Sequence, residues 1–185
     1  MPFVDVATGS LGQGLGCACG MAYSSKYLDT LENRYWVVCG DGECAEGSIW
    51  EAANFASYYA LDNLTLIVDV NRLGQSQATS LEHDVETYYK RFDAFGWNAI
   101  AIDGHDISQI INAFYQSRNS KKPTAIIAHT FKGKYFTELI ENKLDWHGKP
   151  IALEAVYKNV TSLMKNIDVK LVPTGPKVKE WKDQE

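Results

Sequence analysis

The sequence predicts an α/β fold with a doubly wound, mainly parallel sheet and helices on both of its faces. Short apolar runs of strand length alternate along the chain with longer segments that have helical spacing, which is the pattern of repeated strand–helix–strand units. The run at 64–70 reads as a continuous apolar strand, as expected of a strand buried on both faces. The length, 185 residues, is that of one ordinary domain.

Composition and charge exclude several classes of protein. The net charge is −5 and no basic cluster lies before residue 170, so we expect no nucleic-acid partner. No apolar run approaches the roughly eighteen residues of a membrane span, and the chain starts without a basic leader. We therefore expect no membrane segment and a cytoplasmic location. Four cysteines without a C-x-x-C spacing predict reduced, buried thiols rather than a zinc site.

The first element is a glycine-rich start followed by a helix of small residues that runs to about Tyr27. Glycines at a helix start can hold a phosphate. The dinucleotide fingerprint fails here, because Cys19 occupies its third position and no strong strand precedes it. We expect Gly14, Gly16 and Gly20 to allow close packing of the helix on the sheet.

Next come two strands that each end in a side-chain oxygen. The strand at 35–39 leads into Gly40, Asp41 and Gly42, a helix follows at 48–59, and the strand at 64–70 leads into Asn71. The intervening helix brings both strand ends to the same edge of a parallel sheet, where open α/β sheets bind ligands. Asp41 and Asn71 suit Mg²⁺, which takes about six oxygen ligands, and the two glycines let a diphosphate approach. A simple Asp-Gly turn between strand and helix fits the tripeptide equally well.

The remaining elements continue the alternation. A helix at 85–95 carries an aromatic stripe of Tyr88, Tyr89 and Phe92, which we assign to the core. Asp106 and Gln109 form a capping-box pattern, and His105 before them is interpreted as structural. Further elements are expected in this order: a strand at 97–102, a helix to 117, a strand at 123–129, a long loop at 130–150, a helix at 151–166 and a polar, linker-like end at 170–185.

Eight motifs occur in order along the first 150 residues. They are Gly9-Ser10-Leu11-Gly12-Gln13-Gly14, Gly40-Asp41-Gly42-Glu43, Glu46-Gly47-Ser48-Ile49-Trp50-Glu51-Ala52, Asn71-Arg72-Leu73-Gly74-Gln75, Phe95-Gly96-Trp97, Asp103-Gly104-His105, Thr130-Phe131-Lys132-Gly133 and Trp146-His147-Gly148-Lys149-Pro150. Together they closely resemble the thiamine-diphosphate-binding domain of animal transketolases. The resemblance implies an incomplete thiamine-diphosphate-binding fold at 1–150, followed by a helix and tail at 151–185.

The resemblance also implies the roles of individual residues. Mg²⁺, or Ca²⁺ or Mn²⁺ in its place, would be bound by Asp41, Asn71 and the main-chain oxygen of Leu73. Thiamine diphosphate would contact Lys132 and His147, and His147 would also face the sugar substrate as the catalytic residue. The other cofactor contacts implied are Gly9, Ser10, Leu11, Gly42 and Asn71. Glu46 and Glu51 would lie at a dimer interface, although helix capping is a sufficient explanation for Glu46.

Two departures from the family pattern bear on function. Tyr135 stands where the family has a glycine, so a positive φ there would strain the loop that carries Lys132. The catalytic glutamate of the family belongs to a following pyrimidine-binding domain that acts across a dimer interface, and this chain has no counterpart of it. We therefore expect the isolated chain to be inactive and some apolar sheet edge to be exposed.

Three interpretations of function fit these residues. The chain is part of a transketolase that transfers a two-carbon ketol group between sugar phosphates in the pentose phosphate pathway, as a homodimer or paired with a pyrimidine-binding domain. Alternatively, it is a non-catalytic module that binds cofactor or pairs with full-length transketolase. The third is a fragment that does not fold alone.

Overall fold

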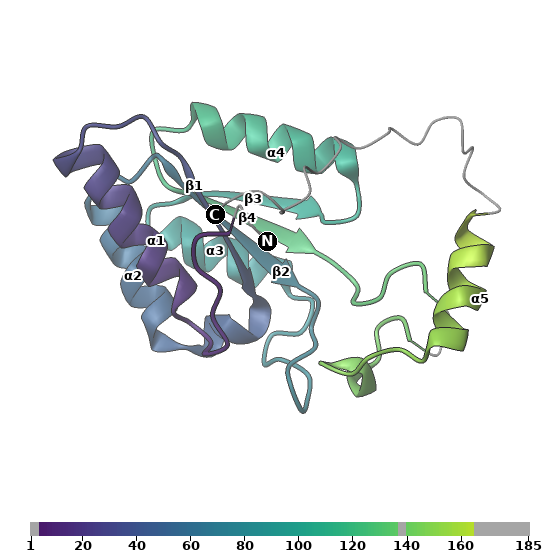
Figure 1. Cartoon of the computed structure of the whole chain (residues 1–185). Helices are drawn as coiled ribbons and strands as arrows, with labels where there is room; N and C mark the ends of the chain where they lie inside the picture. Colours follow the sequence, from purple (N-terminus) through teal and green to yellow (C-terminus); the bar gives the residue numbers. More distant parts are fainter. Residues whose placement is uncertain (1–3, 137–139, 165–185) are drawn as a thin grey trace, which may run out of the picture.

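The computed structural model describes residues 4–136 and 140–164, and within them it contains one four-stranded parallel sheet with the strand order β1-β2-β4-β3. The strands are β1 (Tyr35–Gly40), β2 (Leu64–Val70), β3 (Asn98–Asp103) and β4 (Thr124–His129). The helices are α1 (Gly14–Tyr23), α2 (Gly47–Tyr58), α3 (Val85–Ala94), α4 (Ile107–Asn119) and α5 (Leu153–Met164). Short helical pieces lie at Ser24–Leu28 (π), Asp41–Ala45 and Leu144–Trp146 (both 3₁₀). The predicted doubly wound α/β fold is confirmed (Figure 1).

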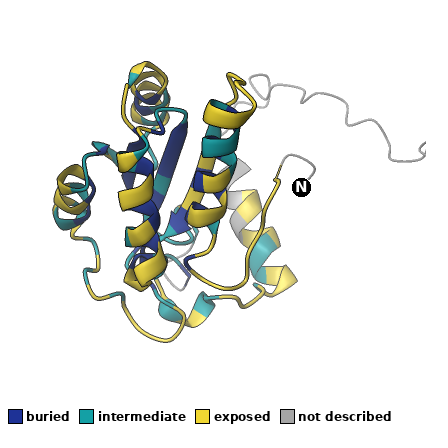
Figure 2. Cartoon of the chain, turned by 90° about the vertical axis from the view of Figure 1, so that its left-hand side faces the viewer, coloured by how far each residue is buried: buried dark blue, intermediate teal, exposed yellow. Residues whose placement is uncertain are grey.

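One face of the sheet is covered by α1, α2 and α3 and holds the main core. Val37, Leu66, Val68 and Ile127 point into it from alternate strand positions, and all are buried. Figure 2 shows buried residues concentrated in the strands and on the helix sides that face them. Trp97 is also fully buried, and its indole N–H donates to the main-chain oxygen of a residue in the middle of α2. The aromatic stripe of α3 enters the core as predicted, with its first and last members buried and the second half-buried.

Among the helices of the described residues, α4 is the one that covers the opposite face. Phe114 of α4 lines a cavity of about 200 Å³ against Ile67, Ile102 and Ile126 of the sheet. β1 lies at the edge of the sheet, and its Val38 remains 71% exposed. The expectation of an exposed apolar edge is therefore confirmed.

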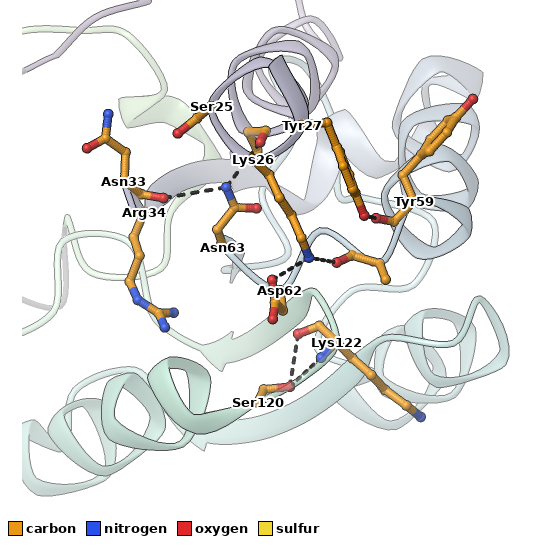
Figure 3. A network of polar contacts seen from close by, with 12 residues as sticks. Ser25, Lys26, Tyr27, Asn33, Arg34, Tyr59, Asp62, Asn63, Ser120 and Lys122 are labelled. Carbon is orange, nitrogen blue, oxygen red and sulfur yellow. Dashed lines mark hydrogen bonds and ion pairs between the residues drawn. The ribbon is translucent and has the colours of Figure 1, made fainter. Parts of the chain in front are cut away.

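The amino ends of the strands are held by a polar network (Figure 3). The Lys26 ammonium, in the π-helical piece that follows α1, binds the Asp62 carboxylate at 2.7 Å and the Ala60 carbonyl at 2.6 Å. The Asn63 amide donates to the carbonyls of Ala22 and Asn33. These contacts tie α1 to the turn that enters β2, so the strand starts in a fixed register.

Several local predictions were wrong. A Cβ at Gly16 or Gly20 would meet nothing within 4 Å, so these two glycines do not serve close packing. The strand at 64–70 is not continuously apolar, because it contains Asp69. Cys17 is exposed, whereas the other three thiols are buried and free.

The last described helix, α5, lies apart from the sheet. Figure 1 shows α5 beyond the carboxyl ends of the strands, connected to β4 by the loop that contains residues 130–150. The predicted tail at 170–185 lies outside the described residues. No helix within residues 4–136 and 140–164 is both long enough and apolar enough to cross a membrane.

Candidate functional site

Asp41 and Asn71 leave neighbouring strands at the same edge of the sheet. The parallel register of β1 and β2 places Gly40 opposite Asp69, so the next residues of both strands emerge together. Both side chains are buried, with 3% of Asp41 and 7% of Asn71 exposed. The main-chain N–H of Arg72 donates to Asp41 Oδ2 at 2.8 Å and joins the two strand ends directly. The sheet topology thus brings together the two residues that the sequence predicted to be close.

The Asp41 carboxylate is surrounded by hydrogen-bond donors. Besides Arg72, the Thr79 hydroxyl donates to Oδ2 at 2.9 Å and the Gly42 N–H donates to Oδ1 at 3.0 Å. Burial nevertheless raises the pKa of Asp41 above its ordinary value, and the nearby Asp69 carboxylate adds to this effect against the three hydrogen bonds. A bound cation would stabilise the charged form of Asp41, because its positive charge offsets both the loss of hydration and the repulsion from Asp69.

The orientation of the Asn71 amide is fixed at both ends. Its Nδ2 donates to Asp69 Oδ2 at 2.9 Å, and its Oδ1 accepts from the Leu73 N–H at 3.0 Å. The Asp69 carboxylate also accepts from the Thr130 hydroxyl. Because the amide nitrogen is held by Asp69, the amide oxygen is the end available to a cation.

The loop after Asn71 is a tight turn closed by main-chain hydrogen bonds. Gly74 N–H donates to the Gln77 carbonyl at 2.9 Å, and Thr79 N–H donates to the Arg72 carbonyl at 2.9 Å. A Cβ at Gly74 would lie 2.7 Å from the Gln77 oxygen, so a glycine is required there. The turn keeps Leu73 and Thr79 beside the strand ends.

These residues fit a hard divalent cation. A carboxylate offers about four lone-pair sites, and the three donors on Asp41 leave one of them free on Oδ1. The Asn71 oxygen likewise retains a second lone pair. No group of three or more His, Cys, Asp or Glu side chains in the described part of the chain is arranged to bind a metal. A site here therefore depends on amide and main-chain oxygens, which Mg²⁺ and Ca²⁺ accept.

The segment with Gly9, Ser10 and Leu11 is exposed and leads into an anchored glycine. Gly12 N–H donates to Glu43 Oε1 at 2.9 Å, and its carbonyl accepts from the Ser48 hydroxyl. The other oxygen of the Glu43 carboxylate accepts from Gly40 N–H at 2.9 Å. Glu43 thus ties the glycine-rich segment to the end of β1. The predicted contacts of residues 9–11 with a cofactor stay predictions.

Lys132 and His147 meet although fifteen positions separate them in the long loop. The distance between Lys132 Nζ and His147 Nδ1 is 3.0 Å. Both residues are half-buried, and Lys132 follows β4 at the same edge of the sheet as Asp41. Their roles as cofactor and catalytic residues stay predictions.

Sequence reasoning missed the residues that support this edge. The Asn71 amide is held by Asp69, and the Asp41 carboxylate is held by Thr79. The loop that contains Lys132 is held by Asn142, which binds Arg72. The available signal was Asp69, because a carboxylate inside a buried strand requires a hydrogen-bond partner. Glu46, by contrast, is the N-cap residue of α2, as its position in the sequence indicated, but its side chain makes no capping hydrogen bond. The stabilising effect of its charge on the helix dipole stays a prediction.

The family model described as the thiamine diphosphate binding domain of transketolase matches residues 1–173. The chain belongs to this transketolase family. Human transketolase-like protein 2 is 52% identical over 180 residues, with 95% of this chain and 28% of that protein covered. Human transketolase is 51% identical over 170 residues, which cover 88% of this chain and 27% of that protein.

Solved transketolases have the same fold. The Campylobacter jejuni enzyme superposes with a TM-score of 0.78 at 35% identity and covers 86% of this chain and 26% of that one. A Pichia stipitis transketolase in complex with sedoheptulose-7-phosphate gives a TM-score of 0.73 at 26% identity. The match covers 88% of this chain and 25% of that one. The predicted resemblance to animal transketolases is confirmed. The chain spans only about a quarter of the length of these relatives.

Proposed function

We propose that this chain binds thiamine diphosphate through a divalent cation, normally Mg²⁺, and supplies the diphosphate-binding half of a transketolase site. The proposal rests mainly on one observation: hydrogen bonds hold Asp41, Asn71 and Leu73 close together at the carboxyl ends of β1 and β2. One carboxylate with neutral oxygens is a typical protein contribution to a Mg²⁺ that also binds phosphate. Mn²⁺ or Ca²⁺ fits the same oxygen ligands.

Each group of the chain has a separate part in this proposal. Asp41 provides the negative charge, while the Asn71 amide and the Leu73 main-chain oxygen provide neutral ligands. Lys132 adds a positive charge near the anionic diphosphate. His147 accepts or donates a proton or hydrogen bond at the sugar, with its Nδ1 held by Lys132. The cofactor, when bound, supplies an electron sink for a carbanion.

The reaction and partners are proposed from the family. The reaction is transfer of a two-carbon ketol group between sugar phosphates, as in the pentose phosphate pathway, and a related transketolase was solved with a sugar phosphate. A second pyrimidine-binding domain, in a homodimer or another chain, would complete the site, with Glu46 and Glu51 at the interface. Four free cysteines support a reducing, cytoplasmic location.

A second function is cofactor binding without turnover, which the same residues at the carboxyl ends of β1 and β2 support. Both candidates predict binding, and they differ in whether turnover appears once a pyrimidine-binding domain completes the site. We expect the pure chain to show no ketol transfer from a ketose phosphate donor to an aldose phosphate acceptor. Measurable turnover would exclude the binding-only function.

Removal of the Asp41 carboxylate tests the metal site. Titration calorimetry of the full chain with thiamine diphosphate should show binding that requires Mg²⁺, and Asp41→Ala should abolish it. Asp41→Asn keeps the side-chain volume and should weaken binding at least tenfold, because the cation loses its only charged protein ligand among the three proposed. Circular dichroism establishes that both variants are folded.

Asp93→Ala is the matched control. Asp93 is exposed in the last turn of α3 and lies beside residues at the amino ends of β3 and β4, away from the site. Its loss should leave the affinity unchanged. A folded wild-type chain without any heat of binding, or unchanged binding in Asp41→Ala, would overturn the proposal.

A further inference from the structure

Arg72 touches two loops that are far apart in the sequence. Its main-chain N–H donates to Asp41, while its guanidinium reaches in another direction. Nε donates to the Asn142 side-chain oxygen at 2.9 Å, and Nη2 donates to the Asn142 main-chain oxygen at 3.2 Å. The forked guanidinium thus binds two oxygens of one residue, a geometry that lysine cannot reproduce.

Asn142 extends the connection to the second half of the candidate site. Its main-chain N–H donates to the Lys132 carbonyl at 2.8 Å. Lys132 in turn contacts His147 through its ammonium group. An unbroken series of hydrogen bonds therefore runs from Asp41, through Arg72 and Asn142, to Lys132 and His147.

The backbone at both ends of the Arg72–Asn142 contact is unusual. Arg72 has φ +63° and Asn142 has φ +58°, so both lie in the left-handed region. Asparagine tolerates this region, whereas arginine adopts it rarely, and a glycine would fit Arg72's backbone better but would lack the guanidinium. Arg72 is held in this conformation by hydrogen bonds at its N–H, its carbonyl and its guanidinium.

We propose that Arg72 and Asn142 form a latch that positions the Lys132–His147 pair relative to the cation site. The inference rests on the proposed function and adds two positioning residues to it. A cation bound at Asp41 and Asn71 fixes the turn that carries Arg72, and the latch then restricts where Lys132 and His147 can lie. Cation binding and the placement of His147 are therefore coupled.

The latch is tested with three variants and one control variant in the full chain. Asn142→Gly accepts the positive φ and keeps the main-chain oxygen but removes the side-chain acceptor. Asn142→Asp keeps an acceptor for the guanidinium and serves as the rescue. Arg72→Lys keeps the positive charge but loses the two-pronged hydrogen bonding of the guanidinium. Arg91→Lys in α3 is the matched control, because the Arg91 guanidinium lies over the Trp50 ring and takes no part in the latch.

The first readout needs no ligand. Nuclear magnetic resonance follows the imidazole signals of His147, one of four histidines in the chain, and hydrogen exchange follows the Asn142 amide. In the ligand-free protein, Asn142→Gly and Arg72→Lys should shift the His147 signals and speed exchange of this amide about tenfold. Asn142→Asp and Arg91→Lys should leave both near wild type. Equal spectra and exchange in all four variants would overturn the latch.

The second readout adds Mg²⁺ with thiamine diphosphate. In the wild type, adding Mg²⁺ with thiamine diphosphate should change the chemical shifts of the His147 imidazole. This change should be smaller in Asn142→Gly and of wild-type size in Asn142→Asp. A wild type that binds the cofactor without any change at His147, or with the same change in Asn142→Gly, would overturn the coupling. Absence of cofactor binding would overturn the proposed function alone, since the ligand-free readout still decides whether the latch exists.

Discussion

Tyr135 adopts a backbone conformation that suits the glycine found there in the family pattern. Its φ is +71°, and the residue is 62% exposed. The Glu141 carboxylate holds the turn by accepting from the Tyr135 N–H at 3.1 Å and from the Lys134 ammonium at 3.3 Å. The positive φ on which the expected strain depended is present, and the Glu141 hydrogen bonds hold the backbone in this conformation.

Replacing Tyr135 should relieve that strain. Tyr135→Gly should be more stable than Tyr135→Ala by about 1 kcal/mol, because both lose the ring and only alanine keeps the Cβ that disfavours positive φ. Chemical denaturation of the two variants measures the difference. Equal stabilities would show that the turn relaxes around a Cβ.

His129 introduces a pH dependence at the carboxyl end of β4. Burial lowers its pKa from the ordinary value of 6.5, and the neighbouring His83 and His105 act in the same direction, while Asp103 raises it. Above pH 6.5 the imidazole is neutral in both the folded and the unfolded chain. As the pH falls below 6.5, the unfolded chain takes up the proton first, so stability is lost until the folded pKa is reached.

The corresponding prediction concerns His129→Gln, which removes the titrating group. Between pH 7.5 and 5 the wild type should lose more thermal stability than this variant, as followed by melting temperature across pH. The imidazole of His129 should titrate with a midpoint below 6.5. A midpoint above 6.5 would mean that Asp103 outweighs burial.

At the scale of elements, Glu43 connects the glycine-rich segment before α1 with the end of β1. It lies in the 3₁₀ helix after β1 and binds the N–H groups of Gly12 and Gly40 with its two carboxylate oxygens. Gly12 also has φ +83°, and a Cβ there would lie 2.6 Å from the Ser48 hydroxyl oxygen. The glycine-rich segment is therefore positioned by one carboxylate and by the absence of a side chain.

Loss of this tie should be measurable. Glu43→Ala leaves two N–H groups without their acceptor and should destabilise the fold by about 1–3 kcal/mol. Hydrogen exchange of the Gly12 and Gly40 amides should accelerate more than that of amides in β4. Uniform acceleration throughout the sheet would indicate a global effect instead of a local one.

Some features of the fold could be predicted from the sequence, and others could not. The four strands and the meeting of Asp41 with Asn71 were predictable, because apolar runs and parallel topology depend on local pattern. The N-cap was also predictable, and Asp106 does accept from the N–H groups of Ser108 and Gln109. The reciprocal half of the capping box is not formed, because the Gln109 side-chain oxygen accepts from the Asp103 N–H instead. The latch was not predictable, since Arg72 and Asn142 lie seventy positions apart and only the folded loops bring them together.

At the scale of the whole molecule, β1 is the exposed side of the sheet. Trp36 and Val38 are 47% and 71% exposed, and a cavity of about 910 Å³ lies between β1, α1 and residues 4–8. An exposed, apolar edge strand favours pairing with another chain. We expect the isolated chain to self-associate with rising concentration.

Val38→Lys tests that expectation. A charge on the edge strand should lower the scattering intensity at high concentration and leave the melting temperature of the dilute protein nearly unchanged, because the side chain is already in solvent. Ile67→Lys on the adjacent strand is the contrasting variant, since this half-buried side chain packs beside Phe114 and its loss should lower the melting temperature. Unaltered association in Val38→Lys would remove β1 as the cause.

The strand order also has a consequence for synthesis on the ribosome. Of the four strands in the described residues, β4 is made last, yet it lies between β2 and β3 and is the one that pairs with β3. β1 and β2 can pair as soon as both have emerged, whereas β3 must wait for residues 124–129. At a synthesis rate of about 5–20 residues per second, β3 has no paired neighbour for roughly one to five seconds between its own synthesis and that of β4. A chaperone would act in this interval.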